Sequence, residues 1–158
     1  MRIADRMGNL GTETAFEVLA EVQKLEAQGR NIISFAIGEP DFATPTNVKQ
    51  AGIAAIEADE THYGPSAGRM ELRQAIAEYI SKTRGIPVTP QHVVVTPGAK
   101  PIIFFTILAL LNPGDEAIYP TPGFPIYESV ISFVDAKPVP LALLESKHFE
   151  FDVDYFRS

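Results

Sequence analysis

The chain has 158 residues, of which 46% are hydrophobic and 21% charged, an ordinary globular composition that excludes a disordered chain and suffices for one folded domain. The net charge of −7, with no basic cluster, excludes nucleic acid and an anionic membrane surface as evident partners, and the most apolar run, Ile102–Leu111, is about half as long as a membrane span. The lack of cysteine excludes disulfides and thiolate chemistry, and the N-terminus does not resemble a signal peptide, so we expect a cytoplasmic protein.

The first third of the chain predicts an arm, two helices and a strand-like run. Residues 1–13 are Gly-rich and show no apolar period, which is typical of an arm. The capping-box pattern Thr14–Glu17 starts a predicted helix over about 14–28, and Ile32–Ile37 is a strand-like run. Thr44 as N-cap and Pro45 at the first helical position predict a helix to about residue 58.

A third helix is predicted after a loop over 59–68. Its apolar face is formed by Leu72, Ile76, Tyr79 and Ile80, and it ends near Gly85. The β-branched run His92–Thr96 then predicts a strand.

The second half of the chain alternates between strand and helix signals. A tight turn at Pro97-Gly98 leads into an apolar helix over 99–111, which Asn112-Pro-Gly terminates. Further strands are expected at 116–119 and 138–142, with a helix reaching residue 134 between them. This order predicts βαβ units and an α/β fold with parallel strands. The tail 149–158 brings fresh apolar residues and no closing signal, so we expect more chain to follow.

The turn before the central helix is a candidate anion site. The first N–H groups of a helix lack intrahelical partners and lie at the positive end of the helix dipole, so they suit a phosphate. Gly98 and Ala99 allow close approach, and Lys100 adds a positive charge. The alternative is a plain strand-to-helix connection with a solvated lysine.

Four motifs together resemble the N-terminal part of class I/II pyridoxal-phosphate-dependent aminotransferases of the aspartate aminotransferase type. They are Ser34–Pro45, His62–Gly68 followed by Leu72-Arg73, Val94–Lys100, and Asn112–Glu116 through Pro122–Tyr127. The resemblance covers nearly the whole chain. It implies the α/β fold of pyridoxal-phosphate-dependent transferases with an incomplete sheet. It also implies an arm and small-domain segment over 1–45 and the N-terminal part of the large cofactor-binding domain over 46–158.

The resemblance assigns roles to residues around the turn. Gly98, Ala99 and Lys100 match the phosphate-binding turn, although many family members have a hydroxyl residue at the position of Lys100. Phe124 matches the aromatic residue that stacks on the pyridine ring of pyridoxal phosphate. The alternative for Phe124 is an ordinary core phenylalanine.

Two further matches lie in loops. Tyr63 matches the tyrosine that reaches the cofactor phosphate of the neighbouring subunit, which implies a homodimer with shared active sites; a surface tyrosine is the alternative. Ile37 and Gly38 match the loop that closes over the substrate carboxylate, although Gly38 also suits a simple turn.

The implied reaction transfers an amino group from an amino acid to a 2-oxo acid through pyridoxal phosphate. The family's Schiff-base lysine, and the residues that tune the cofactor ring and bind the substrate carboxylate, fall in later segments without a counterpart before Ser158. We therefore expect no catalytic residue here, an inactive chain, and a longer parent protein. The histidines lack metal-ligand spacing, so no metal is expected. An aspartate-type substrate is the first expectation, with aromatic and branched-chain amino acids open.

Two other functions compete with this interpretation. One is a phosphate- or nucleotide-binding βαβ module, although the turn lacks the glycine and Lys-Ser/Thr ending of a P-loop and no G-x-G-x-x-G occurs. The other is a non-catalytic chain that pairs with a full-length subunit through the surface near Tyr63. For the chain alone we expect exposed strand edges and apolar helix faces.

Overall fold

A computed structural model describes residues 2–11 and 15–157, which divide into two compact units. The first unit combines residues 1–37 with residues 98–158, and the second contains residues 38–97. These two units do not test the domain boundary expected after residue 45, which stays a prediction.

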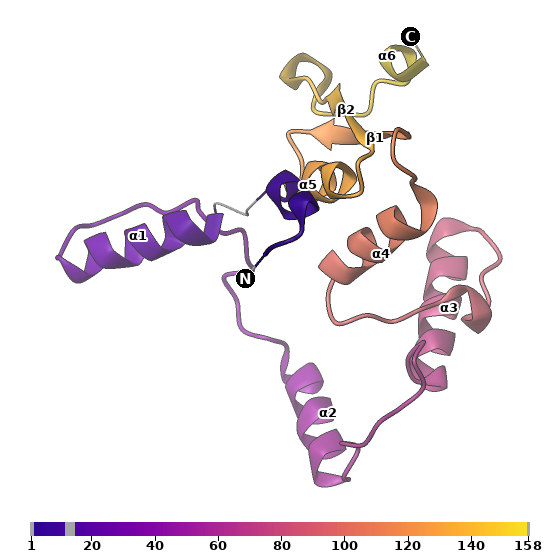
Figure 1. Cartoon of the computed structure of the whole chain (residues 1–158). Helices are drawn as coiled ribbons and strands as arrows, with labels where there is room; N and C mark the ends of the chain where they lie inside the picture. The colour runs from indigo at the N-terminus through magenta and orange to yellow at the C-terminus, as the bar shows by residue number, and fades with distance from the viewer. Residues whose placement is uncertain (1, 12–14, 158) are drawn as a thin grey trace. The chain divides into compact units, whose positions relative to one another are not determined.

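The ordered centre of the first unit is a β-α-β arrangement (Figure 1). Strands β1 (Glu116–Thr121) and β2 (Lys137–Ala142) pair in parallel, in register from Glu116 opposite Lys137 to Thr121 opposite Ala142. Helix α5 (Ile126–Phe133) connects them and packs on both strands. The predicted strands at 116–119 and 138–142, and the α/β class, are confirmed.

Helix α5 and strand β2 supply buried side chains to the core of this unit. Val130 and Ile131 on the helix are each 3% exposed, and Leu141 of β2 is 4% exposed. The apolar face of a short amphipathic helix thus covers the strand pair, and burial of each such side chain stabilises the arrangement by about 1.5–3 kcal/mol.

Helix α4 (Lys100–Leu110) precedes this centre and packs against α5. The ring centroids of Phe104 and Phe133 lie 6.1 Å apart. The helix ends before Asn112, whose backbone N–H donates to the Asp115 carboxylate at 2.7 Å. The apolar helix predicted over 99–111 is confirmed. None of the described helices has both the length and the apolarity needed to cross a bilayer.

The N-terminal arm contains a 3-10 turn, η1 (Asp5–Asn9), which the sequence did not indicate. It is attached to the α5 region, since the Gly11 N–H donates to Ser129 Oγ at 3.0 Å and the Asn9 amide donates to Asp135 at 3.1 Å. Helix α1 (Ala15–Ala27) follows and confirms the predicted helix. Thr14, the expected cap of that helix, lies outside the described residues.

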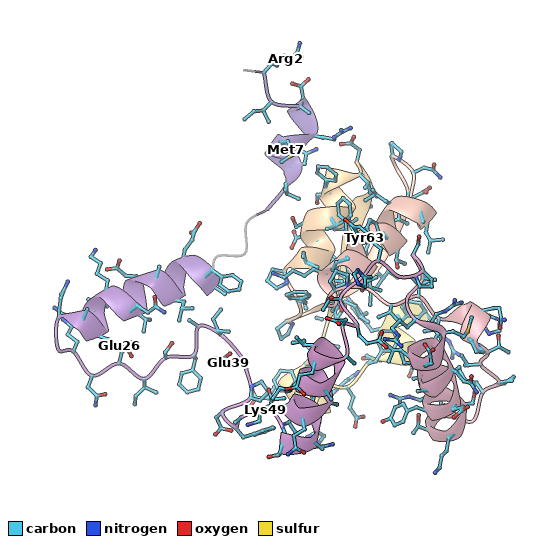
Figure 2. All side chains as sticks on the ribbon, turned by 90° about the horizontal axis from the view of Figure 1, so that it is seen from below. Arg2, Met7, Glu26, Glu39, Lys49 and Tyr63 are labelled. Carbon is cyan, nitrogen blue, oxygen red and sulfur yellow. The ribbon has the colours of Figure 1, made fainter. Side chains whose placement is uncertain are left out.

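The second unit contains α2 (Thr46–Glu57), α3 (Met70–Arg84) and the 3-10 turn η2 (Pro90–His92). Every side chain of α2 is exposed, and Figure 2 shows them extending outward around Lys49. Pro45 is the N-cap of α2, so the predicted cap at Thr44 is wrong by one residue. The extended φ and ψ angles of Pro45 place it just outside the helix.

Helix α3 ends as predicted at Gly85, whose φ of +68° is the left-handed conformation that glycine adopts most readily. The Arg73 guanidinium joins this helix to the segment that follows η2. Its Nε donates to the carbonyl oxygens of Val93 at 2.9 Å and Pro90 at 3.0 Å, and its Nη2 donates to Pro90 at 2.6 Å.

Two predicted strands are wrong. Residues 90–92 form η2 and residues 93–96 belong to neither helix nor strand, and residues 32–37 likewise contain no strand. The physical reason is pairing: a strand needs a ladder of backbone hydrogen bonds with a neighbouring strand, and the described residues provide no such ladder for either run. Consequently Val94 is 64% exposed and Phe35 is 92% exposed.

The C-terminal tail forms the 3-10 turn η3 (Glu145–Lys147) and a short helix α6 (Val153–Arg157). The Asp152 carboxylate accepts hydrogen bonds from the backbone N–H groups of Asp154 and Tyr155, each at 3.1 Å, and pairs with the Lys147 ammonium. This carboxylate therefore acts as the cap of the last helix.

Candidate functional site

The expected phosphate turn lies at the start of α4. Gly98 has a φ of +90°, which favours glycine, and a Cβ atom added there would meet no other atom within 4 Å. The first bonds of the helix run from Ile102 and Ile103 to the Ala99 carbonyl oxygen, and Pro101 contributes no N–H. The backbone N–H groups of Ala99 and Lys100 thus precede the helical hydrogen bonds, at the positive end of the dipole.

Lys100 lies between two aromatic rings. Its Nζ is 5.9 Å from the ring centroid of Phe124 and 5.4 Å from that of Phe16. Both distances fall within the range of cation–π attraction. The structure therefore brings together Lys100 and Phe124, which were singled out from two separate motifs.

Phe16 is the residue at this site that the sequence analysis missed. It is on α1, 55% exposed, and 84 positions before Lys100 in the chain. In the sequence, Phe16 recurs with Leu19, Val22 and Leu25 at helical spacing, which indicates only one face of the predicted helix. No local pattern in the sequence predicts which distant cation such a ring contacts.

The loop from β1 to α5 positions Phe124. The Thr121–Pro122 peptide bond is cis, and a Cβ atom on Gly123 would overlap the Pro120 carbonyl oxygen, so only glycine fits this turn. The half-buried ring of Phe124 meets Tyr127 edge to face, with centroids 6.1 Å apart. The close approach of Gly123 to the Pro120 carbonyl thus constrains the backbone immediately before Phe124.

An apolar pocket of about 540 Å³ adjoins the turn. Residues of α4 and α5 and the arm residues Leu10 and Gly11 line it, with Lys100 as its charged residue. In the same unit, burial and a hydrogen bond with Glu128 raise the pKa of Tyr119. The pocket therefore presents one cation and a largely apolar surface.

Tyr63 lies in the second unit, on the loop between α2 and α3, and its side chain is fully exposed. Arg69 donates to Glu60 at 2.5 Å across this loop, and this hydrogen bond raises the pKa of Arg69. The loop is also attached to the segment after η2, since the Val95 N–H donates to the Ala67 carbonyl oxygen at 3.0 Å. Hydrogen bonds thus hold the loop that carries Tyr63, and the phenol hydroxyl of Tyr63 is accessible.

The remaining candidates are less constrained. Ile37 is half-buried, and Gly38 is exposed with no atom within 4 Å of an added Cβ. Their expected role at the substrate stays a prediction. The described residues contain no group of three or more side chains that could hold a metal ion.

Known proteins resemble the chain over almost its whole length. The family Aminotransferase class I and II matches residues 30–158. A probable aspartate/prephenate aminotransferase of Aquifex aeolicus is 37% identical over 152 residues, which are 96% of this chain and 39% of the relative. An aspartate aminotransferase of Pyrococcus horikoshii is 38% identical, over 93% of this chain and 37% of the relative.

Solved structures agree. Thermus thermophilus aspartate aminotransferase with maleate superposes with a TM-score of 0.92 at 34% identity, covering 99% of this chain and 41% of that one. An alanine aminotransferase of Pyrococcus furiosus gives a TM-score of 0.89 at 33% identity, covering 99% and 40%. The chain spans about two fifths of the length of the relatives it matches. It belongs to the class I and II aminotransferase family, of which it represents the N-terminal part.

Proposed function

We propose that a complete aminotransferase containing this chain transfers an amino group from an amino acid to a 2-oxo acid with pyridoxal phosphate as cofactor. Pyridoxal phosphate supplies an electron sink for the carbon that loses its proton. The observation that carries the proposal is the position of the Lys100 ammonium, 5.9 Å from the centroid of the Phe124 ring and at the N-terminus of α4.

The residues present fit such a cofactor. It combines a phosphate with a flat ring, and the first unit offers an open glycine turn, a helix N-terminus and a cation beside a flat aromatic face. The empty space next to Gly98 is what an approaching phosphate requires. Lys100 adds charge at the same place.

Each site residue then has one task. The backbone at Gly98 and Ala99 and the ammonium of Lys100 bind the phosphate, and Phe124 orients the ring. Tyr63, whose hydroxyl is accessible, donates to the phosphate held by a second copy in a homodimer. Ile37 and Gly38 close over the substrate, where a backbone N–H meets its carboxylate.

The chain alone is proposed to be inactive. No residue among the site candidates acts as the lysine that the reaction needs, and this function falls to the part of the protein outside the chain. The relatives are named for aspartate, prephenate and alanine, so the family leaves the amino acid open. An aspartate-type substrate is our first choice, and we place the enzyme in the cytoplasm.

Family membership favours this function over a nucleotide-binding module, because the match extends over residues 30–158 and not only over the turn. A chain that pairs non-catalytically with a full-length subunit is the remaining alternative. This alternative differs from the proposed function in one expected result: the complex would bind pyridoxal phosphate without any contribution from Gly98.

Two glycine variants test the cofactor turn. Gly98→Glu places volume and negative charge in the phosphate position, and Gly29→Glu introduces a comparable strain at a φ of +83°, also with no neighbouring atoms. We expect equilibrium dialysis with pyridoxal phosphate to show binding about tenfold weaker in Gly98→Glu, from one repulsive charge contact, and unchanged binding in Gly29→Glu. Inorganic phosphate should compete. Equal binding by both variants would refute the assignment of the turn.

A further inference from the structure

The loop over residues 58–69 carries Tyr63 without side-chain packing around its phenol. The phenol is fully exposed, so no neighbouring side chain fixes its direction. A hydroxyl that donates to a phosphate oxygen must lie within about 3 Å of it, and for an exposed side chain the backbone of the loop sets that position. Contacts that order the loop therefore position Tyr63.

An exposed ion pair joins the two ends of this loop. Arg69, at its end, donates to Glu60, near its start, at 2.5 Å, and the Arg69 Nε atom lies 3.6 Å from the Glu71 carboxylate. The side chains of Arg69 and Glu60 are 55% and 47% exposed, and ion pairs with such exposure contribute little to stability. The pair brings the ends of the loop together, but it contributes little to holding the loop in one position.

A closer contact lies at Gly68. A Cβ atom added to Gly68 would lie 2.8 Å from the Cβ atom of Val95 and 2.9 Å from its Cγ2 atom, which is too close for carbon atoms. Gly68 also has a φ of +95°, which favours glycine, and its N–H donates to the Pro65 carbonyl oxygen at 2.9 Å. The Val95 N–H donates to the Ala67 carbonyl oxygen at 3.0 Å. Glycine at position 68 therefore allows the loop to lie directly against Val95.

The segment that contains Val95 is itself attached to α3. The Arg73 guanidinium donates to the carbonyl oxygens of Val93 and Pro90. Val93 is buried, and Arg73 and Val95 are half-buried. Because α3 begins directly after the loop, one helix holds both the end of the loop and the segment against which the loop lies. The contact between Gly68 and Val95 therefore joins two parts with a common support.

We propose that Gly68 and Val95 are positioning residues for Tyr63, because they hold its loop where the hydroxyl reaches the phosphate bound by a second copy of the chain. This inference rests on the proposed function, in which Tyr63 makes that contact. Val95 acts through its backbone N–H and its side chain, and Gly68 acts by leaving room for Val95. Both act through Tyr63, and neither is assigned a contact with the cofactor.

A double-mutant cycle in the complete aminotransferase that contains this chain tests the proposal. Tyr63→Phe removes one hydrogen bond to a charged phosphate, so we expect equilibrium dialysis to show about tenfold weaker binding of pyridoxal phosphate. Gly68→Ala should weaken binding by nearly the same factor. The two changes together should weaken binding no more than Tyr63→Phe alone, to within about twofold, because Gly68 acts through Tyr63.

Gly85→Ala is the matched control. Gly85 belongs to the same unit and has a φ of +68°, and no atom lies within 4 Å of an added Cβ atom. Alanine there introduces comparable backbone strain without a contact with Val95, so cofactor binding should be unchanged.

Val95→Ala is the second variant for the cycle and replaces Gly68→Ala if that protein does not fold. It keeps the backbone hydrogen bond to Ala67 and removes the Cγ2 atom that lies against Gly68. We expect about threefold weaker binding of pyridoxal phosphate, and no further loss when Tyr63→Phe is already present.

A mixed dimer shows which copy is affected. One copy carries Gly98→Glu and keeps an unchanged Tyr63 loop, and the other carries Gly68→Ala and keeps an unchanged turn. Tyr63 serves the phosphate of the other copy, so one site combines the two unchanged parts, and we expect one tightly bound pyridoxal phosphate per mixed dimer. Its absence would mean that Gly68 acts on the turn of its own chain, which follows Val95 by three positions, and would overturn the proposal.

The cycle also separates this proposal from the proposed function. Additive losses from Tyr63→Phe and Gly68→Ala would overturn the positioning role and leave Tyr63 as a phosphate ligand. Equal losses in Gly68→Ala and Gly85→Ala would assign the effect to backbone strain and would also overturn it. No loss in Tyr63→Phe would reject the role of Tyr63 together with this proposal, whereas weaker binding in Gly98→Glu would still support the turn.

Discussion

Segment 93–96 and strand β1 have comparable lengths and β-forming residues, yet only β1 is a strand. The four residues of the segment are all β-branched, whereas β1 contains a glutamate and a proline. Judged by residue type alone, the segment is the better strand former. In the structure it has one backbone hydrogen bond to the loop before α3, from Val95 to Ala67, while β1 has a full ladder with β2.

The difference shows that a pairing partner, more than residue type, decides whether a segment becomes a strand. After β1 the chain makes one helix and returns, so β2 arrives in register within about twenty residues and α5 buries Val130 and Ile131 against both strands. After Thr96 the chain enters α4, and no later described strand returns to pair with the segment. Residue preference thus becomes a strand only where the topology supplies a neighbour.

The largest expected effect comes from removing the buried contact that distinguishes the two regions. Leu141 of β2 is 4% exposed, and we expect Leu141→Ala to lower the free energy of opening of the β1–β2 pair by about 2–4 kcal/mol. Val94→Ala, at a residue 64% exposed, should change it by less than about 0.5 kcal/mol. Hydrogen exchange at the β1 and β2 amides measures both. Equal effects would mean that Val94 stabilises the β1–β2 pair as much as Leu141 does.

Gly123 tests the connection that brings β2 back. An added Cβ overlaps the Pro120 carbonyl oxygen, so Gly123→Ala must displace the backbone between β1 and α5, at a cost of about 2–3 kcal/mol. Gly52→Ala is the matched control, because Gly52 is inside α2 with no atom near the added Cβ. There alanine should stabilise the helix by about 0.5–1 kcal/mol. Circular dichroism and hydrogen exchange report both changes, and a tolerated Gly123→Ala would show that this loop has room to move.

The same comparison explains how far the sequence could predict the fold. Helices were located well, since their caps and apolar periods are local, as the stop at Gly85 illustrates. Strand pairing is not local, and the runs at 32–37 and 93–96 gave correct residue preferences with no information about a neighbour. The 3-10 turn in the arm was missed because its contacts with Ser129 and Asp135 are more than a hundred positions away.

For the candidate site, the sequence indicated motifs but not the contacts between them, and the roles of the site residues stay predictions. Lys100 and Phe124 were chosen from separate motifs, and the structure places the ammonium beside the ring. Phe16 could not be found, because nothing in its helix indicates Lys100 as its neighbour. The roles of Tyr63 and Gly38 depend on a second chain and a substrate, so those remain predictions.

A smaller effect is expected from the residue that holds segment 93–96 in place. The Arg73 guanidinium, half-buried, donates to the carbonyl oxygens of Val93 and Pro90, and Arg73→Met removes these bonds while keeping the length of the side chain. We expect a loss of about 1–2 kcal/mol in the protection of the Val95 amide against hydrogen exchange. The exposed Arg84 ends the same helix, and Arg84→Met should leave that amide unchanged. Unaltered protection in Arg73→Met would mean that the Ala67 carbonyl alone orders the segment.

The smallest effect concerns the C-terminal tail, a region ordered, like segment 93–96, by side-chain hydrogen bonds and without a strand partner. The Lys147 ammonium, followed by the Tyr155 backbone N–H, lowers the pKa of Asp152 below its ordinary value of 3.8. A depressed pKa in the folded state means that the contribution of the carboxylate is present above the unfolded value and is lost as the pH falls through the folded one.

We therefore expect the Tyr155 amide resonance to be constant at neutral pH and to shift toward its disordered position below pH 3.8, as α6 loses its cap. Asp152→Asn should weaken the cap at every pH. It should also remove this transition, because the side chain of asparagine does not titrate in this range. Asp154→Asn, whose side chain lies in the first turn of α6, should leave the transition in place. A transition of the same size in Asp152→Asn would assign the acid sensitivity of the tail to another carboxylate and would leave Asp152 as a cap without an electrostatic role.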